Sequence, residues 1–451
     1  MKLWDKGGTT DSLTERFTVG RDAEFDMLLA PFDALGSIAH AVMLAEVGLL
    51  SQNEAALIVN ELRNIYGEIA DRRFFIEKGV EDIHSQIELE LTRRLGDTGK
   101  KIHSGRSRND QIITDIALFL RHKLSVTAHE TYELAQILLQ LSDKYRDALL
   151  PGYTHFQVAM PSSFGLWFGA YSESFTDDLI ILRGIFSVIN KNPLGSGAGY
   201  GSSFPLDRLR TTKLLGFAAL DINSIYAQMK RGKLEKITAD AIANIAATLA
   251  KMSMDITLYV SQNFAFVSFP DDLTTGSSIM PHKKNPDIFE LIRAKCNKIQ
   301  SVGNTISSVS RNLPSGYHRD MQIIKEILFP ALDELSDCLN MMCRTITHIQ
   351  IRANILADER YRHAFSVEEV NRLVGQGVPF RDAYSIVAKS IESGSFAPDF
   401  NLNHTHEGSI GNLCNGDIGQ DLDNTMDSFP FAAVKKALDS LLHDDLLMFS
   451  R

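Results

Sequence analysis

Residues 110–150 read DQIITDIALFLRHKLSVTAHETYELAQILLQLSDKYRDALL and contain neither glycine nor proline. Apolar side chains recur at every fourth position along the first half of this run, at Ile112, Ile116, Leu120 and Leu124. That spacing keeps them on one face of an α-helix, because a helix completes a turn in about 3.6 residues. Since glycine and proline are the usual helix breakers, their absence predicts one long helix here.

Two further runs, 233–269 and 331–360, also lack glycine and proline. The first carries a helical stripe formed by Ile237, Ala241, Ile245, Leu249 and Met252. Helices of this length exceed the size of a small domain, so we expect a bundle whose helices pack against copies from other subunits. The alternative is a series of shorter helices joined by polar hinges. Because alternating strand patterns are scarce, the sequence predicts a mainly α fold.

The composition is that of an ordinary globular chain. Of its 451 residues 44% are hydrophobic and 23% are charged, and 46 Lys and Arg against 56 Asp and Glu give a net charge of −10. A protein that binds nucleic acid or a membrane surface normally presents a basic face, so this balance argues against both partners. Any anionic ligand must therefore be held by a local cluster of cations.

The sequence favours a reduced, cytoplasmic protein without a structural metal. Its four cysteines, Cys296, Cys338, Cys343 and Cys414, match neither a disulfide framework nor a zinc pattern. The first residues, MKLWDKGGTTD, lack the apolar core of a signal peptide. No stretch is expected to be both apolar and long enough to span a bilayer.

The length exceeds what one hydrophobic core usually supports, so several domains are expected. We predict an N-terminal helical domain at 1–110, a central long-helix domain at 111–360 and a small C-terminal helical domain at 361–451. The last boundary falls where the helical runs become shorter and are broken by glycine and proline.

The segment GSSIMPHKKNPD at 276–287 combines small, cationic and rigid residues. Its glycine permits unusual dihedral angles, and its second proline is suited to opening the helix that contains Glu290. Backbone N–H groups together with Lys283 would form a pocket for a doubly charged oxyanion. Only such a pocket would let Ser277 act as a base, because a serine hydroxyl must first lose its proton. The alternative is a mobile surface loop.

A second polar segment, KIHSGRSRNDQ at 101–111, precedes the first long helix. Arg106 and Arg108 lie here, where guanidinium groups and the N–H groups of a helix start both favour carboxylates. The alternative is a solvated basic turn in which Asn109 or Asp110 caps the helix.

Two more segments offer polar groups outside the helices. GYTHFQ at 152–157 places His155 in a turn, where a histidine transfers protons near neutral pH or is simply solvated. YHRDMQIIKE at 317–326 puts Gln322 and Lys325 on one helical face, with Tyr317 at or before the helix start. Taken alone, the second segment indicates only the beginning of an amphipathic helix.

The segment GSSIMPHKKNPDIFELIR resembles the signature G-S-S-x-M-P-x-K-x-N of the fumarase/aspartase superfamily. SGRSRNDQ, GYTHFQ and the Lys-Lys-Asn-Pro-Asp ending are similar to the argininosuccinate lyases within it. Further matches are DALGSIAH at 33–40, EDIH at 81–84, YHRDMQIIK at 317–325 and GVPFRDAY at 377–384. Because these matches run through nearly the whole chain in the family's order, chance does not account for the set.

That resemblance implies cleavage of argininosuccinate to arginine and fumarate, the last step of arginine biosynthesis, without a metal or an organic cofactor. Ser277 would take a proton, and the charge would spread into a carboxylate as a dianionic enediolate. The residues implied to hold the enediolate are Lys283, Asn285 and the backbone around Ser278. His155, polarised by Glu290, would protonate the departing nitrogen. Which of Ser277 and His155 is base and which is acid stays open.

The resemblance also implies which residues bind substrate. Those that grip the succinate carboxylates would be Arg108, Asn109 and Thr154. Those that bind the arginine end would be Tyr317, Gln322 and Lys325, with support from Asp82, His84 and Arg106. Family members form homotetramers in which each active site takes loops from three subunits, which would explain the long helices.

The chain departs from the family pattern in several places. Family members usually carry a serine within F-N-x-S-I, whereas FTVGRDAEFD here leaves open whether Arg21 or Asp22 replaces it. QMKRGKLE at 228–235 keeps only Arg231 of the pattern S-D-R-D-F, and His282 stands where these lyases usually have glutamine. The implied function has two alternatives. One is another fumarate-releasing lyase, such as adenylosuccinate lyase, and the other is a non-catalytic structural protein on the same scaffold.

Overall fold

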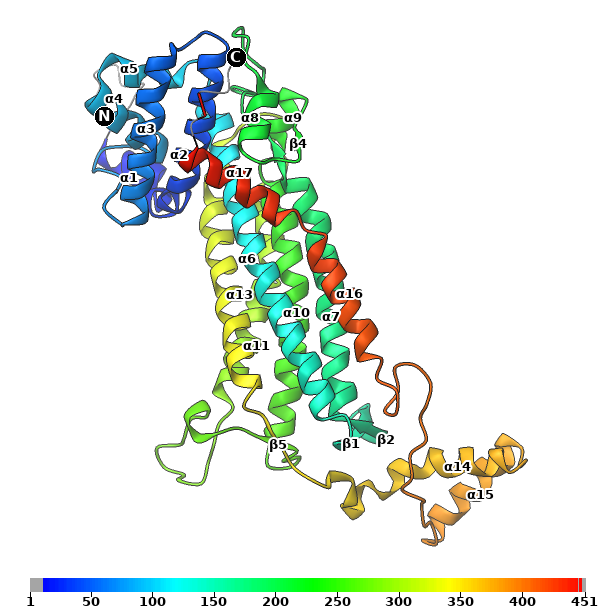
Figure 1. Cartoon of the computed structure of the whole chain (residues 1–451). Helices are drawn as coiled ribbons and strands as arrows, with labels where there is room; N and C mark the ends of the chain where they lie inside the picture. The colour runs from blue at the N-terminus through cyan, green and yellow to red at the C-terminus, as the bar shows by residue number, and fades with distance from the viewer. Residues whose placement is uncertain (1–10, 445, 448–451) are drawn as a thin grey trace.

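The computed structural model of the chain describes residues 11–444, 446 and 447. A column of long helices runs through the molecule, and shorter elements gather at its two ends (Figure 1). The strands among the described residues form three two-stranded sheets. The prediction of a mainly α fold built on a long-helix bundle is therefore confirmed.

The column consists of α6 (Arg108–Lys144), α7 (Phe164–Ile189), α10 (Lys233–Val260), α11 (Asp287–Ile299), α12 (Val302–Val309) and α13 (Ile324–Ile346). Its interior contains the stripes that the sequence predicts. Ile116, Leu120 and Leu124 of α6 are fully buried, as are Ile245 and Leu249 of α10. The helical spacing of these residues thus decides which face of each helix points inward.

The predicted runs are longer than the helices they contain. α6 ends at Lys144, because the chain then turns into a hairpin of β1 (Leu149–Thr154) and β2 (Gln157–Ser163). α10 ends at Val260, ahead of β5 (Val267–Ser268), which pairs with β6 (Gln350–Ile351). α13 begins before Pro330 and includes it. Short strand pairs, rather than glycine or proline, end the first two helices.

The N-terminal helices occupy one end of the column: α1 (Ser12–Val19), α2 (Asp22–Glu46), α3 (Gln52–Ala70), α4 (Ile83–Leu95) and α5 (Asp97–Lys100). The loop that follows α7 lies at the same end. It is accompanied by α8 (Arg208–Leu214), α9 (Ser224–Met229), β3 (Lys191–Asn192) and β4 (Ala219–Leu220). The 3₁₀ helices among the described residues are η1 (Lys101–His103), η2 (Asp271–Leu273), η3 (Arg319–Ile323), η4 (Ile355–Ala357) and η5 (Glu359–Phe365).

Helix α2 is the described helix whose length and composition would suit a membrane span, contrary to the expectation from the sequence. In the folded chain 83% of its apolar window is buried against other helices. The same helix buries Asp26, Asp33 and His40. Packing at the end of the bundle therefore accounts for its apolar side chains.

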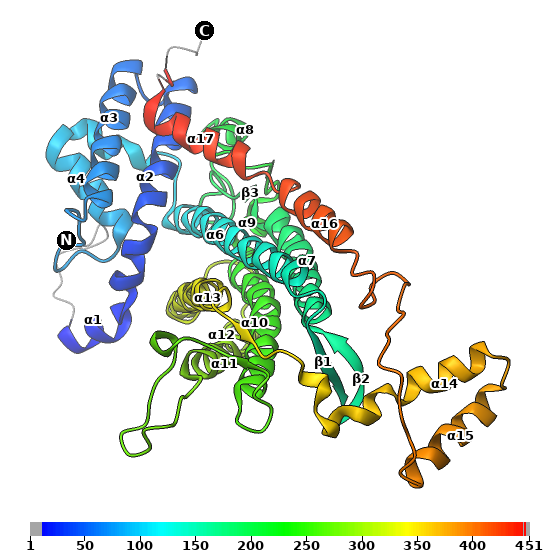
Figure 2. The ribbon, with the colours of Figure 1, turned by 60° about the horizontal axis from the view of Figure 1, so that its bottom comes forward.

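The opposite end of the column carries the β1–β2 hairpin and the segment between β5 and α11 (Figures 1 and 2). This segment contains residues 276–286, and α11 begins directly after Pro286, as the sequence predicts. The two features that the sequence marks as chemical, GYTHFQ and GSSIMPHKKNPD, therefore lie at the same end of the bundle but on separate elements.

After α13 the chain leaves the column and returns to it. α14 (Ser366–Gly375) and α15 (Phe380–Glu392) share a small core of their own, formed by Val370, Ala383, Val387 and Phe396. α16 (Asn415–Asp427) then packs along α7 and α6, and α17 (Phe431–His443) packs against α2 and α8. The last helices thus join the two ends of the main core.

Candidate active site

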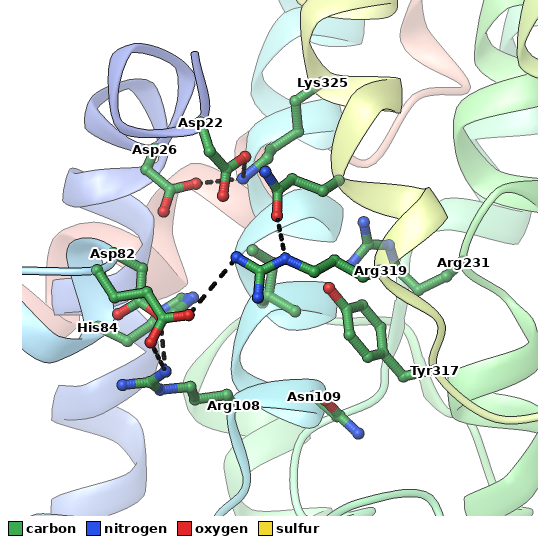
Figure 3. A pocket seen from close by; sticks show the side chains of 13 residues that line it. Asp22, Asp26, Asp82, His84, Arg108, Asn109, Arg231, Tyr317, Arg319 and Lys325 are labelled. Atoms are coloured by element: carbon green, nitrogen blue, oxygen red, sulfur yellow. Dashed lines mark hydrogen bonds and ion pairs between the residues drawn. The ribbon is translucent and has the colours of Figure 1, made fainter. Parts of the chain in front are cut away.

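A cavity of about 170 Å³ lies at the end of the bundle that carries the N-terminal helices (Figure 3). The starts of α2, α4 and α6 meet η3 there. The sequence-predicted residues that line it are Asp82, His84, Arg108, Asn109, Tyr317, Gln322 and Lys325. Segments more than two hundred positions apart in the chain are thus brought to one cavity.

The start of α6 is fixed by a reciprocal cap. Ser107 accepts a hydrogen bond from the backbone N–H of Asn109, and Asp110 accepts one from the N–H of Ser107 at 2.9 Å. Ser107 is therefore the N-cap, and the alternative that placed Asn109 or Asp110 there is wrong. The second carboxylate oxygen of Asp110 accepts the N–H groups of Gly195 and Gly197. One buried carboxylate thus ties the loop that follows α7 to the start of α6.

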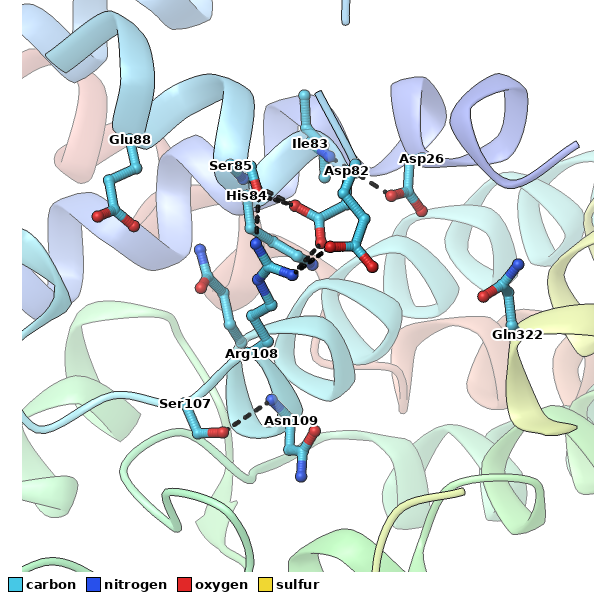
Figure 4. Close-up of polar contacts among 12 residues, drawn as sticks. Asp26, Asp82, Ile83, His84, Ser85, Glu88, Ser107, Arg108, Asn109 and Gln322 are labelled. Atoms are coloured by element: carbon cyan, nitrogen blue, oxygen red, sulfur yellow. Dashed lines mark hydrogen bonds and ion pairs between the residues drawn. The ribbon is translucent and has the colours of Figure 1, made fainter. Parts of the chain in front are cut away.

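Arg108 points from this helix start toward α4 (Figure 4). Its Nη1 lies 3.1 Å from Glu81 and 3.2 Å from Asp82, and its Nη2 donates to Ser85 Oγ at 2.5 Å. Asp82 itself caps α4 by accepting the N–H of Ser85. The guanidinium group is therefore held in one orientation by two carboxylates and a hydroxyl.

His84 lies behind the cavity in a buried ion-pair network. Its Nδ1 makes a short hydrogen bond to Asp33 and lies 3.5 Å from Asp115. Burial alone would lower the pKa of His84, but the charge and hydrogen bond of Asp33, together with the charges of Asp82 and Asp115, outweigh it and raise that pKa to about 9. The same ring counteracts the effect of burial on Asp33 and holds the pKa of that carboxyl below its usual value. His84 is therefore a charged support of the cavity wall.

Asp33, His84 and Asp115 are also the described side chains whose ligand atoms lie close enough together, within 4.8 Å, to hold a metal ion. Gln111 donates to Asp33 at 2.9 Å, and Ser37 donates to the same carboxylate at 3.0 Å. Arg106 turns toward this network and donates to Ser37 Oγ, so it does not line the cavity. The donors around Asp33 fit a hydrogen-bonded ion pair.

The His84–Asp33 pair predicts a pH-dependent stability. A histidine whose pKa is raised on folding contributes stability that is complete below its unfolded pKa, about 6.5, and is lost as pH rises through its folded value. We therefore expect the free energy of unfolding to fall by about 3 kcal/mol per subunit between pH 6.5 and pH 9.5. Urea denaturation at one fixed protein concentration measures it. An unchanged midpoint over this range would contradict the assignment.

Lys325 occupies the opposite wall of the cavity (Figure 3). Its Nζ makes a short contact with Asp26 and lies 2.6 Å from Asp22. Gln322 lies one turn earlier, and its amide donates to the carbonyls of Thr18 and Val19 at the end of α1. This amide must leave α1 if it is to bind a ligand.

Arg231 completes the cavity from the start of α10. Its Nε lies 3.1 Å from Glu235, and its Nη2 donates to the carbonyl of Met321. Its Nη1 is buried and has no partner. The guanidinium carbon lies 5.9 Å from the centre of the Tyr317 ring. An unpartnered, buried N–H donor beside the cavity is suited to an anionic ligand atom.

Thr154 and His155 lie at the tip of the β1–β2 hairpin, away from this cavity. His155 and Phe156 both have positive φ angles, 52° and 57°, as a two-residue hairpin turn requires. Neither residue is glycine, so the turn is strained, and strain of this kind is typical of functional positions. His155 is exposed, and 74% of Phe156 is accessible.

Ser277 and Ser278 lie in the loop that precedes α11. The Oγ of Ser277 accepts the backbone N–H groups of Ile279 at 3.3 Å and Met280 at 3.2 Å. Two N–H dipoles directed at one hydroxyl oxygen lower the cost of ionising it. Asn285 donates to the carbonyl of Gly276 at 3.4 Å, while Lys283 and Glu290 are exposed.

Within one chain the predicted residues therefore form three groups. Those of the cavity lie at one end of the bundle, whereas the hairpin tip and the 276–287 loop lie at the other (Figures 1 and 2). The cavity therefore contains neither the candidate serine nor the candidate histidine of the same chain. The two remaining groups carry the ionisable serine and the histidine.

Four residues that line the cavity were not predicted as site residues: Asp26, Glu81, Arg231 and Arg319. Asp22, which also lines it, was left open as a replacement for the family's serine. Glu81 and Arg319 lie inside the quoted segments EDIH and YHRDMQIIK. Their position beside predicted site residues could therefore have identified them. Asp26 is a charged residue in an otherwise apolar helical stretch, which is costly without a partner and was a usable signal.

The sequence model of the family described as Lyase matches residues 5–301. The argininosuccinate lyase of Phocaeicola vulgatus is 55% identical over 441 residues, covering 98% of this chain and 99% of that protein. The argininosuccinate lyase of Parabacteroides distasonis is 56% identical over 443 residues, with coverages of 98% and 99%. Among solved structures, EDDS lyase in complex with formate has the same fold, with a TM-score of 0.78, 22% identity and coverages of 98% and 96%.

The signature segments occupy loops and helix starts of a fold shared with another lyase, and the relatives match over nearly their whole length. Identity at this level with these relatives is far above the level at which only the fold is shared. The chain belongs to the argininosuccinate lyase family.

Proposed function

We propose that this protein cleaves argininosuccinate to L-arginine and fumarate in arginine biosynthesis, in the cytoplasm. The observation that carries the proposal is the identity of 55% with proteins named argininosuccinate lyase over 98% of this chain. The cavity supports it, because Arg108, Arg231 and Lys325 supply cations for a ligand with several carboxylates.

Incubation of the purified protein with argininosuccinate, followed by ultraviolet absorbance of fumarate, tests this proposal. Adenylosuccinate is the matched substrate, since its cleavage releases the same fumarate from a different amine. Turnover of argininosuccinate is expected. Turnover of adenylosuccinate alone would overturn the assignment.

In the proposed reaction a base removes a proton from the carbon next to one succinate carboxylate. The electron pair left behind spreads into that carboxylate as an enediolate dianion. It then forms the double bond of fumarate as the neighbouring carbon–nitrogen bond breaks, and an acid gives the departing nitrogen its proton. Ser277 and His155 are the proposed base and acid, in an order that stays open, and Glu290 polarises the histidine.

The enediolate carries an extra negative charge, which the 276–287 loop is suited to stabilise. Lys283 supplies a cation, Asn285 an amide donor, and the backbone near Ser278 N–H groups. The N–H groups of Ile279 and Met280 reach Ser277 Oγ in the free chain, which favours its alkoxide. Arg108, Asn109 and Thr154 are proposed to hold the succinate carboxylates, and Tyr317, Gln322 and Lys325 the arginine end.

We propose further that the active site is assembled from several subunits of a homotetramer. The support is the separation of the three groups of residues within one chain. The ends that must meet other subunits expose apolar side chains, with 74% of Phe156 and 83% of Ile279 accessible. The domain boundaries at 110 and 360 stay a prediction.

A shared site predicts that two inactive variants restore each other. Arg108→Ala removes a cavity residue and Ser277→Ala a loop residue, so neither homotetramer should turn over. After mixed refolding at equal amounts, about a quarter of the sites should receive both intact residues, because each comes independently from a different subunit. Fumarate release from the mixture measures it. No regain of activity in tetramers shown to be mixed would contradict a site shared between subunits.

A further inference from the structure

Four carboxylates face the cavity, and two of them are neutralised there. Glu81 lies 3.1 Å from Arg108 and 3.6 Å from Arg319. Asp82 lies 3.2 Å from Arg108. On this wall of the cavity two negative charges thus meet two positive charges, so no net charge is left for a cationic ligand.

The other two carboxylates, Asp22 and Asp26, share the single ammonium group of Lys325 (Figure 3). Asp26 is fully buried, and its second oxygen accepts the N–H of Ile83 at 3.4 Å. Asp22 has 16% of its side chain accessible and lines the cavity. Two carboxylates therefore share one ammonium group here, and Asp22 is the one of the two that a ligand in the cavity can reach.

The ionisation of Asp22 agrees with this charge count. Burial, followed by the neighbouring charge of Asp26, raises the pKa of Asp22 to about 6, and Lys325 offsets only part of that effect. A carboxylate in this situation gains from a second cation placed beside it in the cavity.

Arg21, the neighbouring residue in the sequence, is directed elsewhere. Its Nη2 lies 2.8 Å from Glu24, and both side chains are 60% accessible. Its guanidinium group lies over the ring of Phe25, 4.9 Å from the ring centre. Arg21 does not line the cavity that holds Lys325. Arg21 and Asp22 are the two candidates to replace the family's serine. Of these, Asp22 is the one that lines the cavity.

We propose that Asp22 binds the α-ammonium group of the amino-acid half of the substrate and selects ligands that carry this group. The proposal rests on the proposed function for the identity of the substrate. An amino acid has its α-ammonium and α-carboxylate groups on one carbon, and the cavity has Asp22 and Lys325 side by side. The two charge pairs are complementary.

The test compares L-arginine with its hydroxy analogue, L-argininic acid, in which a hydroxyl replaces the α-ammonium group. Calorimetric titration of the intact wild-type oligomer should show tighter binding of arginine. In Asp22→Asn, arginine should bind about 10- to 100-fold more weakly, as expected for loss of a hydrogen bond between charged groups. Argininic acid should change by less than about threefold, because it lacks the group that Asp22 contacts.

Glu24→Gln is the matched control, because Glu24 lies on the same turn of α2 but points to solvent and should leave both affinities unchanged. Asp22→Ser provides a second variant in case Asp22→Asn does not assemble. Equal affinity of the wild type for the two ligands, or an unchanged preference in either Asp22 variant, would overturn the proposal.

Fumarate release from argininosuccinate by the wild type is measured in parallel. Its absence would refute the proposed function. Its presence, together with an unchanged preference for arginine in the Asp22 variants, would refute only the role of Asp22.

Discussion

Ser277→Ala is expected to lower the turnover of argininosuccinate roughly a hundred- to ten-thousand-fold, the range associated with loss of a proton-transferring group. The expected loss is in kcat, because a hydroxyl with the proposed role acts in the transition state and contributes little to ground-state binding. Fold and assembly should be retained. Ser277 lies in a loop, and its described contacts are the two N–H groups of Ile279 and Met280.

Thr274→Ala is the matched control for this variant. Thr274 lies just before the same loop, and its hydroxyl only donates to the carbonyl of Asp271 at 3.2 Å. Its removal should leave kcat within about twofold of wild type, as for most surface substitutions. Steady-state kinetics with gel filtration to verify the oligomer measures both variants. Wild-type kcat in Ser277→Ala would refute the assignment of Ser277 as the proton-transferring residue.

His84→Asn is expected to cost about 3–5 kcal/mol of stability per subunit, because it leaves the Asp33 carboxylate buried without its cation. Asp33 is fully buried, and its remaining described donors are the neutral side chains of Ser37 and Gln111. Neutral donors compensate a buried charge only partly. Urea denaturation at pH 7 and fixed protein concentration measures the loss.

The double variant Asp33→Asn/His84→Asn removes both charges of the pair, whereas His84→Asn removes one charge and leaves the other unpaired. Removing both charges leaves no unpaired ion, so the double variant should be more stable than His84→Asn alone. The account would be contradicted if the loss of stability in the double variant equalled the sum of the losses in His84→Asn and Asp33→Asn measured separately. Such additivity would mean that the two side chains do not interact.

The helical column was predictable from the sequence, because packed helices carry apolar residues at a regular spacing along the chain. In the two stripes Ile116, Leu120 and Leu124 of α6 and Ala241, Ile245, Leu249 and Met252 of α10 are buried as their spacing indicates. The first residue of each stripe, Ile112 and Ile237, is only partly buried. The ends of those helices were less predictable. α6 is followed by the local hairpin of β1 and β2. α10 is followed by β5, whose partner β6 is distant in the sequence, so this pairing leaves no local trace.

The candidate site was predictable where its residues lie in compact polar segments. Arg108, Tyr317 and Lys325 meet at one cavity, as the resemblance implies. Asp22 was not chosen because its segment departs from the family pattern. Arg231 was not chosen because it is the one residue of its segment that matches that pattern. Their proximity to Lys325 and Tyr317 arises only when α2, α10 and η3 pack together. The roles of Ser277 and His155 stay predictions, because within one chain their side chains do not reach the cavity.

The hairpin tip has a consequence for engineering. Its left-handed pair, His155 and Phe156, occupies positions where Asn-Gly would relax the backbone, so stability-guided sequence design would favour that exchange. Adopting it would remove the histidine that we propose to transfer a proton, together with an exposed ring. A selection for heat resistance alone would thus favour a more stable form that lacks the proposed proton-transferring histidine.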